Sequence, residues 1–300
     1  MADYVLGVHI CPHQVRAVAL ERGARDSRLL LLSELTARFP EGLHDDANPD
    51  QASNVMAATL ASFVKNLRSP VRTVAVTFDA TFLFLAAIPT EPRSAESPLA
   101  ERVSWELGQF FPGTKLDQFV TDVHVIANPV AQKYDELLIV AIRRDLTRSV
   151  RRALEKEGFA LHLVDVDHFS TELALKLNYP DTYSRYVALV GIKDFRLDVS
   201  LLRNGALESY RYFLLHSKTD AIQHLGTLSR ETPGLASIVV YGPALDNGLL
   251  VQLRQGSAIV VEALNPLRHV GVAETVQLPE SFDSPPYRFA PAIGVALRRD

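Results

Sequence analysis

The sequence has only one cysteine and no strong excess of charge of either sign. Cys11 is the single cysteine among 300 residues, which excludes an internal disulfide framework and a zinc site made of several cysteines. The net charge of -4 and the pI near 6.1 give no reason to expect a nucleic-acid partner, because a duplex binder needs a concentrated basic face. We therefore expect a protein of a reducing compartment that does not bind nucleic acid.

Long hydrophobic runs are also missing. The longest apolar runs, at residues 82–88 and 137–142, are far shorter than the roughly 18–20 residues that cross a bilayer. The N-terminal Met-Ala-Asp-Tyr has no basic region followed by an apolar core, as a signal peptide would. We expect a cytoplasmic protein without a membrane span, which could still dock on a membrane protein.

Signatures of common catalytic and metal sites are missing too. The chain has no Walker-type phosphate loop, no Gly-x-Gly-x-x-Gly, no Gly-x-Ser-x-Gly and no His-Glu-x-x-His. His9 and His13 flank a turn, and His162, Asp165, Asp167 and His168 form a cluster in sequence. Strand alternation would divide that cluster between two faces, and Asp167 suits the cap of a following helix. We therefore predict no metal site.

What the sequence does contain is one pattern that occurs twice. Residues 4–20 and 186–202 each open with an apolar run, turn on a short polar segment and continue with β-branched and aliphatic residues. Such a pattern is typical of a β-hairpin. We therefore expect an α/β protein with two similar halves, residues 1–180 and 181–300.

The first half is predicted to follow a β-β-β-α-β order. A third strand is expected at 28–36, a helix that begins at Asn48 and Pro49, and buried strands at 71–78 and 82–88. This order is typical of the ribonuclease-H-like and actin-like superfold. An inserted α+β subdomain is expected at about residues 93–165, with a helix at 99–111, strands at 119–126 and 136–142, and a helix at 145–157.

The helix expected at 145–157 is strongly basic. The arginines at its start and on its exposed side are Arg143, Arg144, Arg148, Arg151 and Arg152. Such a run is typical of a solvated helix face, and a docking surface for an acidic partner or for lipid headgroups is the second interpretation.

The second half is predicted to be shorter. After its hairpin we expect strands at 208–214, 237–240 and 258–262, with helices at 219–229 and 247–254. Apolar residues at helical spacing predict a closing helix at 287–298, which could pack on the first half.

Several segments, taken in order, resemble one family. They are Gly-Val-His-Ile at 7–10 with Val-Arg-Ala-Val at 15–18, Trp-Glu-Leu-Gly-Gln-Phe-Phe-Pro at 105–112 followed by 119–123, Leu-Ile-Val-Ala at 138–141, Val-Asp-Val-Asp at 164–167, and Ala-x-x-Ile-Gly-x-Ala-Leu-Arg at 290–298. With these motifs the chain resembles the PilM family, which are cytoplasmic actin-like proteins of type IV pilus assembly related to the cell-division protein FtsA. The resemblance spans nearly the whole chain and implies an actin-like ATPase fold with an inserted subdomain in the first half.

The same resemblance implies a nucleotide site between the two hairpin turns, and here the chain departs from the family. Active relatives carry an aspartate in each turn, and this chain has His9 and Gly191 instead. The degenerate phosphate loops contain His9, Cys11, Gly191 and Lys193, and the degenerate adenosine loop contains Tyr241, Gly242 and Pro243. Lys193 replaces a flexible glycine whose backbone should approach phosphate, and Pro243 lacks a backbone donor.

The helical subdomain that encloses the nucleotide base in relatives is also reduced, because few residues separate the strand near Leu214 from Ser237. We therefore predict a protein without an ATP–magnesium cofactor and without catalytic activity. His9 and Lys193 could still hold an anion without a metal.

The resemblance finally implies a partner. In PilM-like proteins a groove between the first subdomain and the inserted one receives the cytoplasmic tail of PilN, a membrane-anchored protein of the inner-membrane platform. The equivalent groove here would be lined by Leu83, Leu85, Trp105, Phe110, Phe111, Phe119 and Val123. The alternatives are an active actin-like ATPase or a sugar-kinase-like phosphotransferase with a replacement carboxylate such as Asp194 or Asp79, and self-assembly into a homo-oligomer.

Overall fold

The computed structural model describes residues 3–23, 26–36, 54–55, 57–59, 61–63, 71–90, 99–113, 115–126, 135–274, 276 and 285–299. The helix start expected at Asn48 and Pro49 lies outside the described residues, and so does residue 93, the expected start of the insertion. The described residues between 54 and 63 are helical.

The first sheet has six strands in the order β14-β3-β2-β1-β4-β8. Its strands are β1 (Asp3–Ile10), β2 (Gln14–Arg22), β3 (Ser27–Thr36), β4 (Thr73–Phe78), β8 (Ala160–Val166) and β14 (Gly271–Val272). β1 and β2 form the expected antiparallel hairpin, and β4 pairs in parallel with β1 and with β8. These central strands are covered on both faces, which explains why they are near-continuous apolar runs in the sequence.

The second sheet repeats this arrangement. Its order is β11-β10-β9-β12-β13. The strands are β9 (Tyr186–Ile192), β10 (Arg196–Arg203), β11 (Ala206–Leu214), β12 (Ser237–Tyr241) and β13 (Val260–Ala263). As in the order β3-β2-β1-β4-β8, three antiparallel strands are followed by two strands added in parallel. The two halves therefore share one topology.

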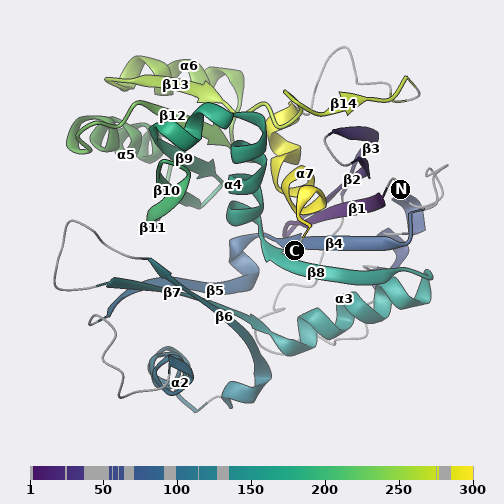
Figure 1. Ribbon diagram of the computed structural model, residues 1–300. Helices are drawn as coiled ribbons and strands as arrows, with labels where there is room; N and C mark the ends of the chain where they lie inside the picture. Colours follow the sequence, from purple (N-terminus) through teal and green to yellow (C-terminus); the bar gives the residue numbers. More distant parts are fainter. Residues whose placement is uncertain are drawn as a thin grey trace.

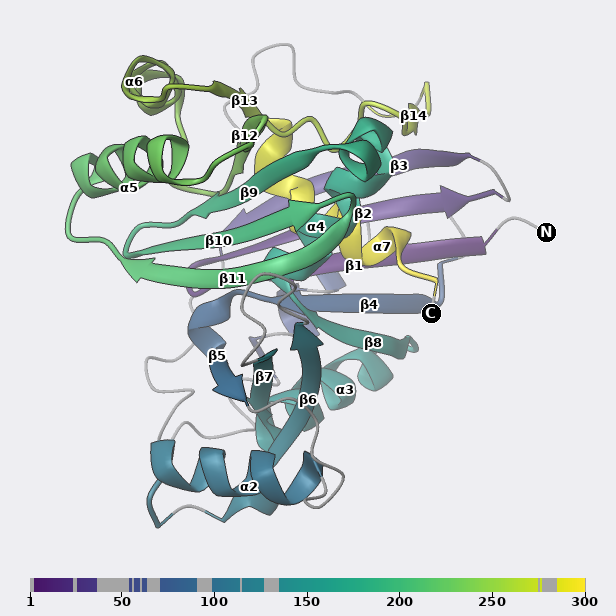
Figure 2. The same cartoon turned by 60° about the vertical axis from the view of Figure 1, so that its left-hand side comes forward.

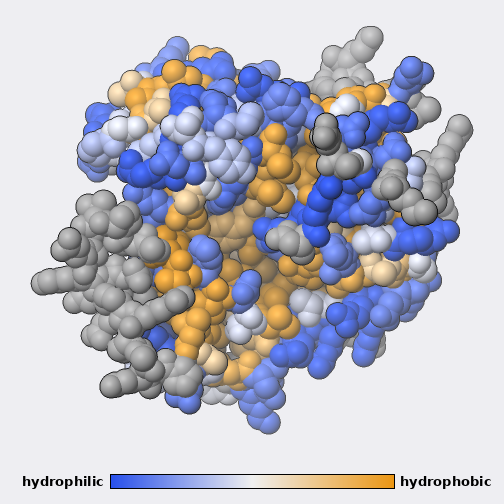
Figure 3. Space-filling view, viewed as in Figure 1, coloured by the Kyte–Doolittle hydropathy of each residue, from blue (hydrophilic) through white to orange (hydrophobic). Residues whose placement is uncertain are grey.

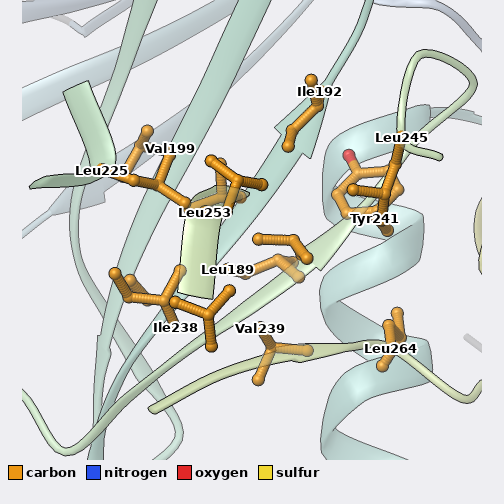
Figure 4. Close-up of a cluster of buried hydrophobic side chains, with 14 of the residues drawn as sticks. Leu189, Ile192, Val199, Leu225, Ile238, Val239, Tyr241, Leu245, Leu253 and Leu264 are labelled. Atoms are coloured by element: carbon orange, nitrogen blue, oxygen red, sulfur yellow. The ribbon is translucent and has the colours of Figure 1, made fainter. Parts of the chain in front are cut away.

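Helices fill the space between the two sheets and cover their outer faces (Figure 1). The helices are α3 (Arg144–Lys156), α4 (Asp167–Asn178), α5 (Lys218–Glu231), α6 (Asn247–Gly256) and α7 (Ala290–Leu297). α4 and α7 lie between the sheets and pack on one another, and α7 also contacts β1, β2 and β4. The second half has a contiguous aliphatic core beneath α5 and α6, with Tyr241 at its edge (Figure 4).

A third, three-stranded sheet stands apart from the other two (Figure 2). Its order is β5-β7-β6, with β5 (Leu83–Thr90), β6 (Phe119–Ile126), β7 (Asp135–Arg143) and the covering helix α2 (Leu99–Phe110). The structure differs here from the limits of 93–165 expected for the insertion. β5 already belongs to this sheet because it pairs antiparallel with β7, whereas β8 has returned to the first sheet.

The segment between β11 and β12 holds one helix, α5. Ser217 and Asp220 form a reciprocal capping box at its start, which fixes the first turn. Within the described ranges, no helix combines the length and the hydrophobicity that a bilayer span requires.

Candidate functional site

The two hairpin turns place Cys11 and Lys193 at equivalent positions. The backbone N–H of Cys11 donates to the carbonyl of Gln14 at 2.9 Å, and that of Lys193 donates to Arg196 at 2.9 Å. Two residue pairs further back in each hairpin, His9 lies opposite Arg16 and Gly191 lies opposite Asp198. The four residues of the degenerate phosphate loops therefore occupy matching places in the two halves.

Lys193 is the centre of a buried charge cluster between the halves. Its Nζ lies 2.7 Å from Asp167 Oδ2, 3.1 Å from Asp198 Oδ2 and 3.4 Å from Asp79 Oδ2. The lysine is only 5% exposed. Burial lowers the pKa of Lys193, but the three carboxylates outweigh burial and raise it well above its ordinary value. Lys193 is therefore a charged ammonium group inside the protein.

Asp198 is held by further donors. Its Oδ1 accepts hydrogen bonds from Arg196 Nε at 2.7 Å and from the Tyr210 hydroxyl at 2.6 Å. Burial would raise the pKa of Asp198, but Lys193 and Arg196 outweigh it and lower the pKa. The carboxylate is therefore ionised and has cations on both of its oxygens.

His9 links this cluster to the first hairpin turn. Its Nε2 lies 3.7 Å from Asp167 Oδ2, and Cys11 Sγ lies 3.4 Å from the same nitrogen. Burial lowers the pKa of His9, but Cys11 and Asp167 outweigh burial and raise it from 6.5 to about 9. His9, Cys11 and Asp79 bring potential ligand atoms within 4.8 Å of one another. Two cationic side chains already contact these three residues: Arg16 Nη1 donates to Cys11 Sγ at 3.3 Å, and Lys193 contacts Asp79.

Tyr241, from the degenerate adenosine loop, fills the space beside the second hairpin. Its hydroxyl lies 2.9 Å from His168 Nδ1, and the opposite nitrogen of His168 lies 2.9 Å from Ser200 Oγ. A Cβ atom added to Gly191 would lie 2.7 Å from the Tyr241 hydroxyl. Burial lowers the pKa of His168 to about 4, so this histidine is neutral at physiological pH.

Gly242, which follows Tyr241, needs to be glycine. Its φ is +124°, and a Cβ atom there would lie 2.2 Å from the carbonyl oxygen of Ile192. The adenosine-loop position therefore lies directly against the second phosphate-loop hairpin.

A lateral groove of about 900 Å³ lies between β6 and β8. Its apolar lining includes Leu83, Val120, Val140, Leu161, Val164 and Phe169. α3 contributes Arg144, Arg148 and Arg151, and the second half contributes Ala206 and Leu207. Figure 3 shows a hollowed hydrophobic area in the middle of the face of the molecule that Figure 1 presents. β6 and β8 are the end strands of their sheets, so each has an edge that no strand of the described residues pairs with.

A family model for the type IV pilus assembly protein PilM matches residues 7–212, which is well over half of the chain. The chain belongs to the PilM family. No curated protein sequence matches it.

Solved structures agree with this PilM assignment at the level of the fold. A chain of the PilM–PilN type IV pilus biogenesis complex is 18% identical, with a TM-score of 0.76 over 98% of this chain and 97% of that one. The ethanolamine utilization protein EutJ from Carboxydothermus hydrogenoformans is 10% identical, with a TM-score of 0.53 over 98% and 89%. A Bacteroides thetaiotaomicron protein of actin-like ATPase fold and unknown function is 13% identical, with a TM-score of 0.52 over 88% and 91%. The actin-like fold expected from the sequence is thus confirmed.

The structure of this PilM-family chain brings together only part of the groove expected from its sequence. Leu83 and Val123 line the lateral groove, although Val123 also packs against the cluster under α2, and Leu85 lies in a small buried cluster next to the groove. The aromatic residues Trp105, Phe110, Phe111 and Phe119 do not line it. Strand alternation explains the difference, because Phe119 points from β6 to the face that α2 covers, where Phe111 packs against it at 4.9 Å. Trp105 and Phe110 are 62% and 52% exposed on α2.

Sequence reasoning missed the other side of the groove in this PilM-family chain. Val120 and His124 on β6, Leu161 and Val164 on β8, and Leu207 on β11 all line it. Alternation along β6 separates Val120 from Phe119, but the sequence did not indicate which face α2 covers. The sequence does show the basic helix, and its Arg144, Arg148 and Arg151 reach the groove. Arg144 also donates hydrogen bonds to the carbonyls of Asp117 and Phe119.

The raised pKa of His9 predicts that this PilM-family protein loses stability in alkali. Its protonated form is favoured in the folded state, so this contribution is fully present below pH 6.5 and is lost as the pH rises through about 9. The loss should be on the order of 3 kcal/mol. Urea unfolding at neutral and alkaline pH would measure it, and the His9→Gln variant should show a correspondingly smaller loss. An equal loss in both proteins would contradict the assignment of this titration to His9.

Proposed function

We propose that this PilM-family protein is a non-catalytic scaffold of a type IV pilus or secretion-type assembly platform, and that its lateral groove binds the cytoplasmic tail of a PilN-like bitopic membrane protein. The observation that carries the proposal is the apolar groove between the unpaired edges of β6 and β8. Family membership and the fold shared with the PilM–PilN complex support it. The protein would then be cytoplasmic and held at the inner membrane by its partner.

Two free strand edges make this groove suitable for an extended peptide. A strand added to an edge gains main-chain hydrogen bonds, and alternate side chains enter pockets on the sheet face. Val120 on β6 is 40% exposed, and Leu161 and Val164 on β8 are only partly covered. Exposed apolar edges of this kind invite pairing with another chain unless a partner covers them.

The charges around the groove favour a tail with an acidic residue near α3. Asp165 at the base of the groove pairs with Arg298 at 3.2 Å, and Glu172 pairs with Lys176 at 2.6 Å. Arg148 and Arg151 are exposed on the α3 side and face the groove without a carboxylate within ion-pair distance among the described residues. A carboxylate of the partner would pair with these two arginines. The basic helix α3 would then be part of the docking surface.

The catalytic alternative has less support from the residues that it would need. Asp79, one of the two candidate replacement carboxylates, contacts the Lys193 ammonium at 3.4 Å. Asp194, the other, is exposed at the tip of the second hairpin. Neither is a free carboxylate beside an open phosphate site.

A charge introduced into the groove should prevent tail binding. In Val120→Asp, an extended peptide would have to bury a carboxylate against an apolar floor, and we expect the affinity for the PilN-like tail to fall by about tenfold or more. Fluorescence anisotropy with a labelled tail peptide would measure the affinity. Val251→Asp is the matched control, because it makes the same substitution at an exposed valine of α6 outside the groove. Equal affinities of the two variants would remove the groove as the binding site.

A further inference from the structure

The actin-like fold leads us to expect ATP with magnesium between the two hairpin turns, and the residues found there do not fit that group. Magnesium keeps several waters and takes oxygen ligands, and phosphate needs free N–H donors. Here three carboxylates already share one ammonium, and His9, Lys193 and Tyr241 are 1%, 5% and 1% exposed. An aspartate at position 191, as in active relatives, would collide with the Tyr241 hydroxyl.

We propose that the Lys193 ammonium is a built-in cation that takes the place of the bound metal and phosphate and fastens the two halves of the protein together. The chain would then keep its two halves in contact without any nucleotide. This inference concerns the cleft between the halves and does not depend on which partner occupies the lateral groove.

The charge balance of the cluster supports this role. The carboxylates of Asp79, Asp167 and Asp198 face Lys193, while Arg196 neutralises the second oxygen of Asp198 and His9 approaches Asp167. With His9 protonated, three negative groups meet three positive ones, and no charge remains to attract a divalent cation. Buried charges are tolerated only when they are paired in this way.

The geometry also makes Lys193 a bridge. Lys193 and Asp198 belong to the second hairpin, whereas Asp79 follows β4 and Asp167 opens α4 in the first half. The sequence predicted Asp167 as a helix cap, but its Oδ2 instead points to the ammonium of the other half at 2.7 Å. β11 contacts β5 and β6 at the groove, so the bridge also keeps the groove wall from the second half in place.

A consequence is that removing the Lys193 side chain should create a cation-binding site. Asp167 Oδ2 and Asp198 Oδ2 accept no aligned hydrogen bond from the described residues, so the ammonium is what compensates their burial. If Lys193 is shortened to alanine, three carboxylate oxygens are left around the vacated position. Hard divalent cations favour such a set of oxygen ligands.

The test compares wild type, Lys193→Ala and Lys218→Ala. Lys218 pairs with Asp246 on the surface, so its removal deletes a lysine ion pair without opening a buried site. Thermal midpoints would be measured with and without MnCl2, together with the electron paramagnetic resonance signal of free Mn²⁺. We expect Lys193→Ala to have a lowered midpoint without metal. At an Mn²⁺ concentration about a hundred times the Kd, the thermal midpoint of Lys193→Ala should rise by roughly 5 °C, while the signal of free Mn²⁺ falls.

Wild type and Lys218→Ala should respond neither to Mn²⁺ nor to millimolar ATP–magnesium. A wild-type midpoint that rises with ATP–magnesium would overturn the proposal, and so would a folded Lys193→Ala protein that takes up no Mn²⁺. If Lys193→Ala does not fold, the double variant with Asp198→Asn should recover folding, because it removes one negative charge together with the positive charge of the ammonium. A double variant that also stays unfolded counts against the ammonium as the balancing charge.

Discussion

Replacing Asp198 with asparagine is expected to lower the free energy of unfolding by about 3–5 kcal/mol, because the change removes one partner from a buried ion cluster. Asp198 is fully buried and compensates two cations, Lys193 at 3.1 Å and Arg196 at 2.7 Å. A neutral amide cannot balance these charges, although it can still accept a hydrogen bond from the Tyr210 hydroxyl. The penalty therefore comes from uncompensated charge rather than from lost volume.

Urea unfolding monitored by circular dichroism would measure this loss as a lower midpoint at an unchanged slope. Asp194→Asn is the matched control, since the same substitution then falls on an exposed residue four positions earlier in the hairpin. We expect the control to stay within about 0.5 kcal/mol of wild type. If both variants lost the same small amount of stability, the buried cluster would not be the stabilising feature that the distances indicate.

The repeated hairpin was the part of the fold that the sequence predicted best. Residues 4–20 and 186–202 became β1–β2 and β9–β10 because burial on both faces leaves a long apolar signature in each strand. The helices were also located, since α3 and α5 carry clear helical periodicity and end signals. The limits of the insertion were less predictable, because the pairing of β5 with β7 is a contact between segments far apart in the chain.

The chemistry of the cleft could be predicted only in part. His9, Gly191 and Lys193 stood out as departures from the family pattern. The structure places Lys193 in the second hairpin turn, whereas His9 and Gly191 lie in the strands that lead into the two turns. The ion cluster itself was not predictable, because Asp79, Asp167 and Lys193 come from three distant segments that meet only in the folded protein. For the groove, alternation along β6 defines two faces of the strand. Which of the two faces α2 covers depends on tertiary packing, and the local sequence does not indicate it.

A methyl group added at Gly294 should destabilise the protein as strongly as the loss of Asp198. Gly294 lies where α7 crosses α4, and a Cβ atom there would sit 1.8 Å from the carbonyl oxygen of Ser170. The obstacle is backbone, so it cannot turn aside as a flexible side chain could. α7 would have to move away from α4 and also from β1, where its Ala292 carbonyl lies against Gly7. We expect Gly294→Ala to cost about 3 kcal/mol or more.

Gly108→Ala is the matched control, because it is the same substitution inside another helix, α2, with no atom within 4 Å of the new Cβ. There only helix propensity changes, and the variant should gain about 1 kcal/mol over wild type. Thermal and urea unfolding of the two proteins should therefore move in opposite directions from wild type. A Gly294→Ala protein as stable as wild type would mean that α7 and α4 pack less closely than the structure has them, and the two halves would then be joined chiefly by the charges around Lys193.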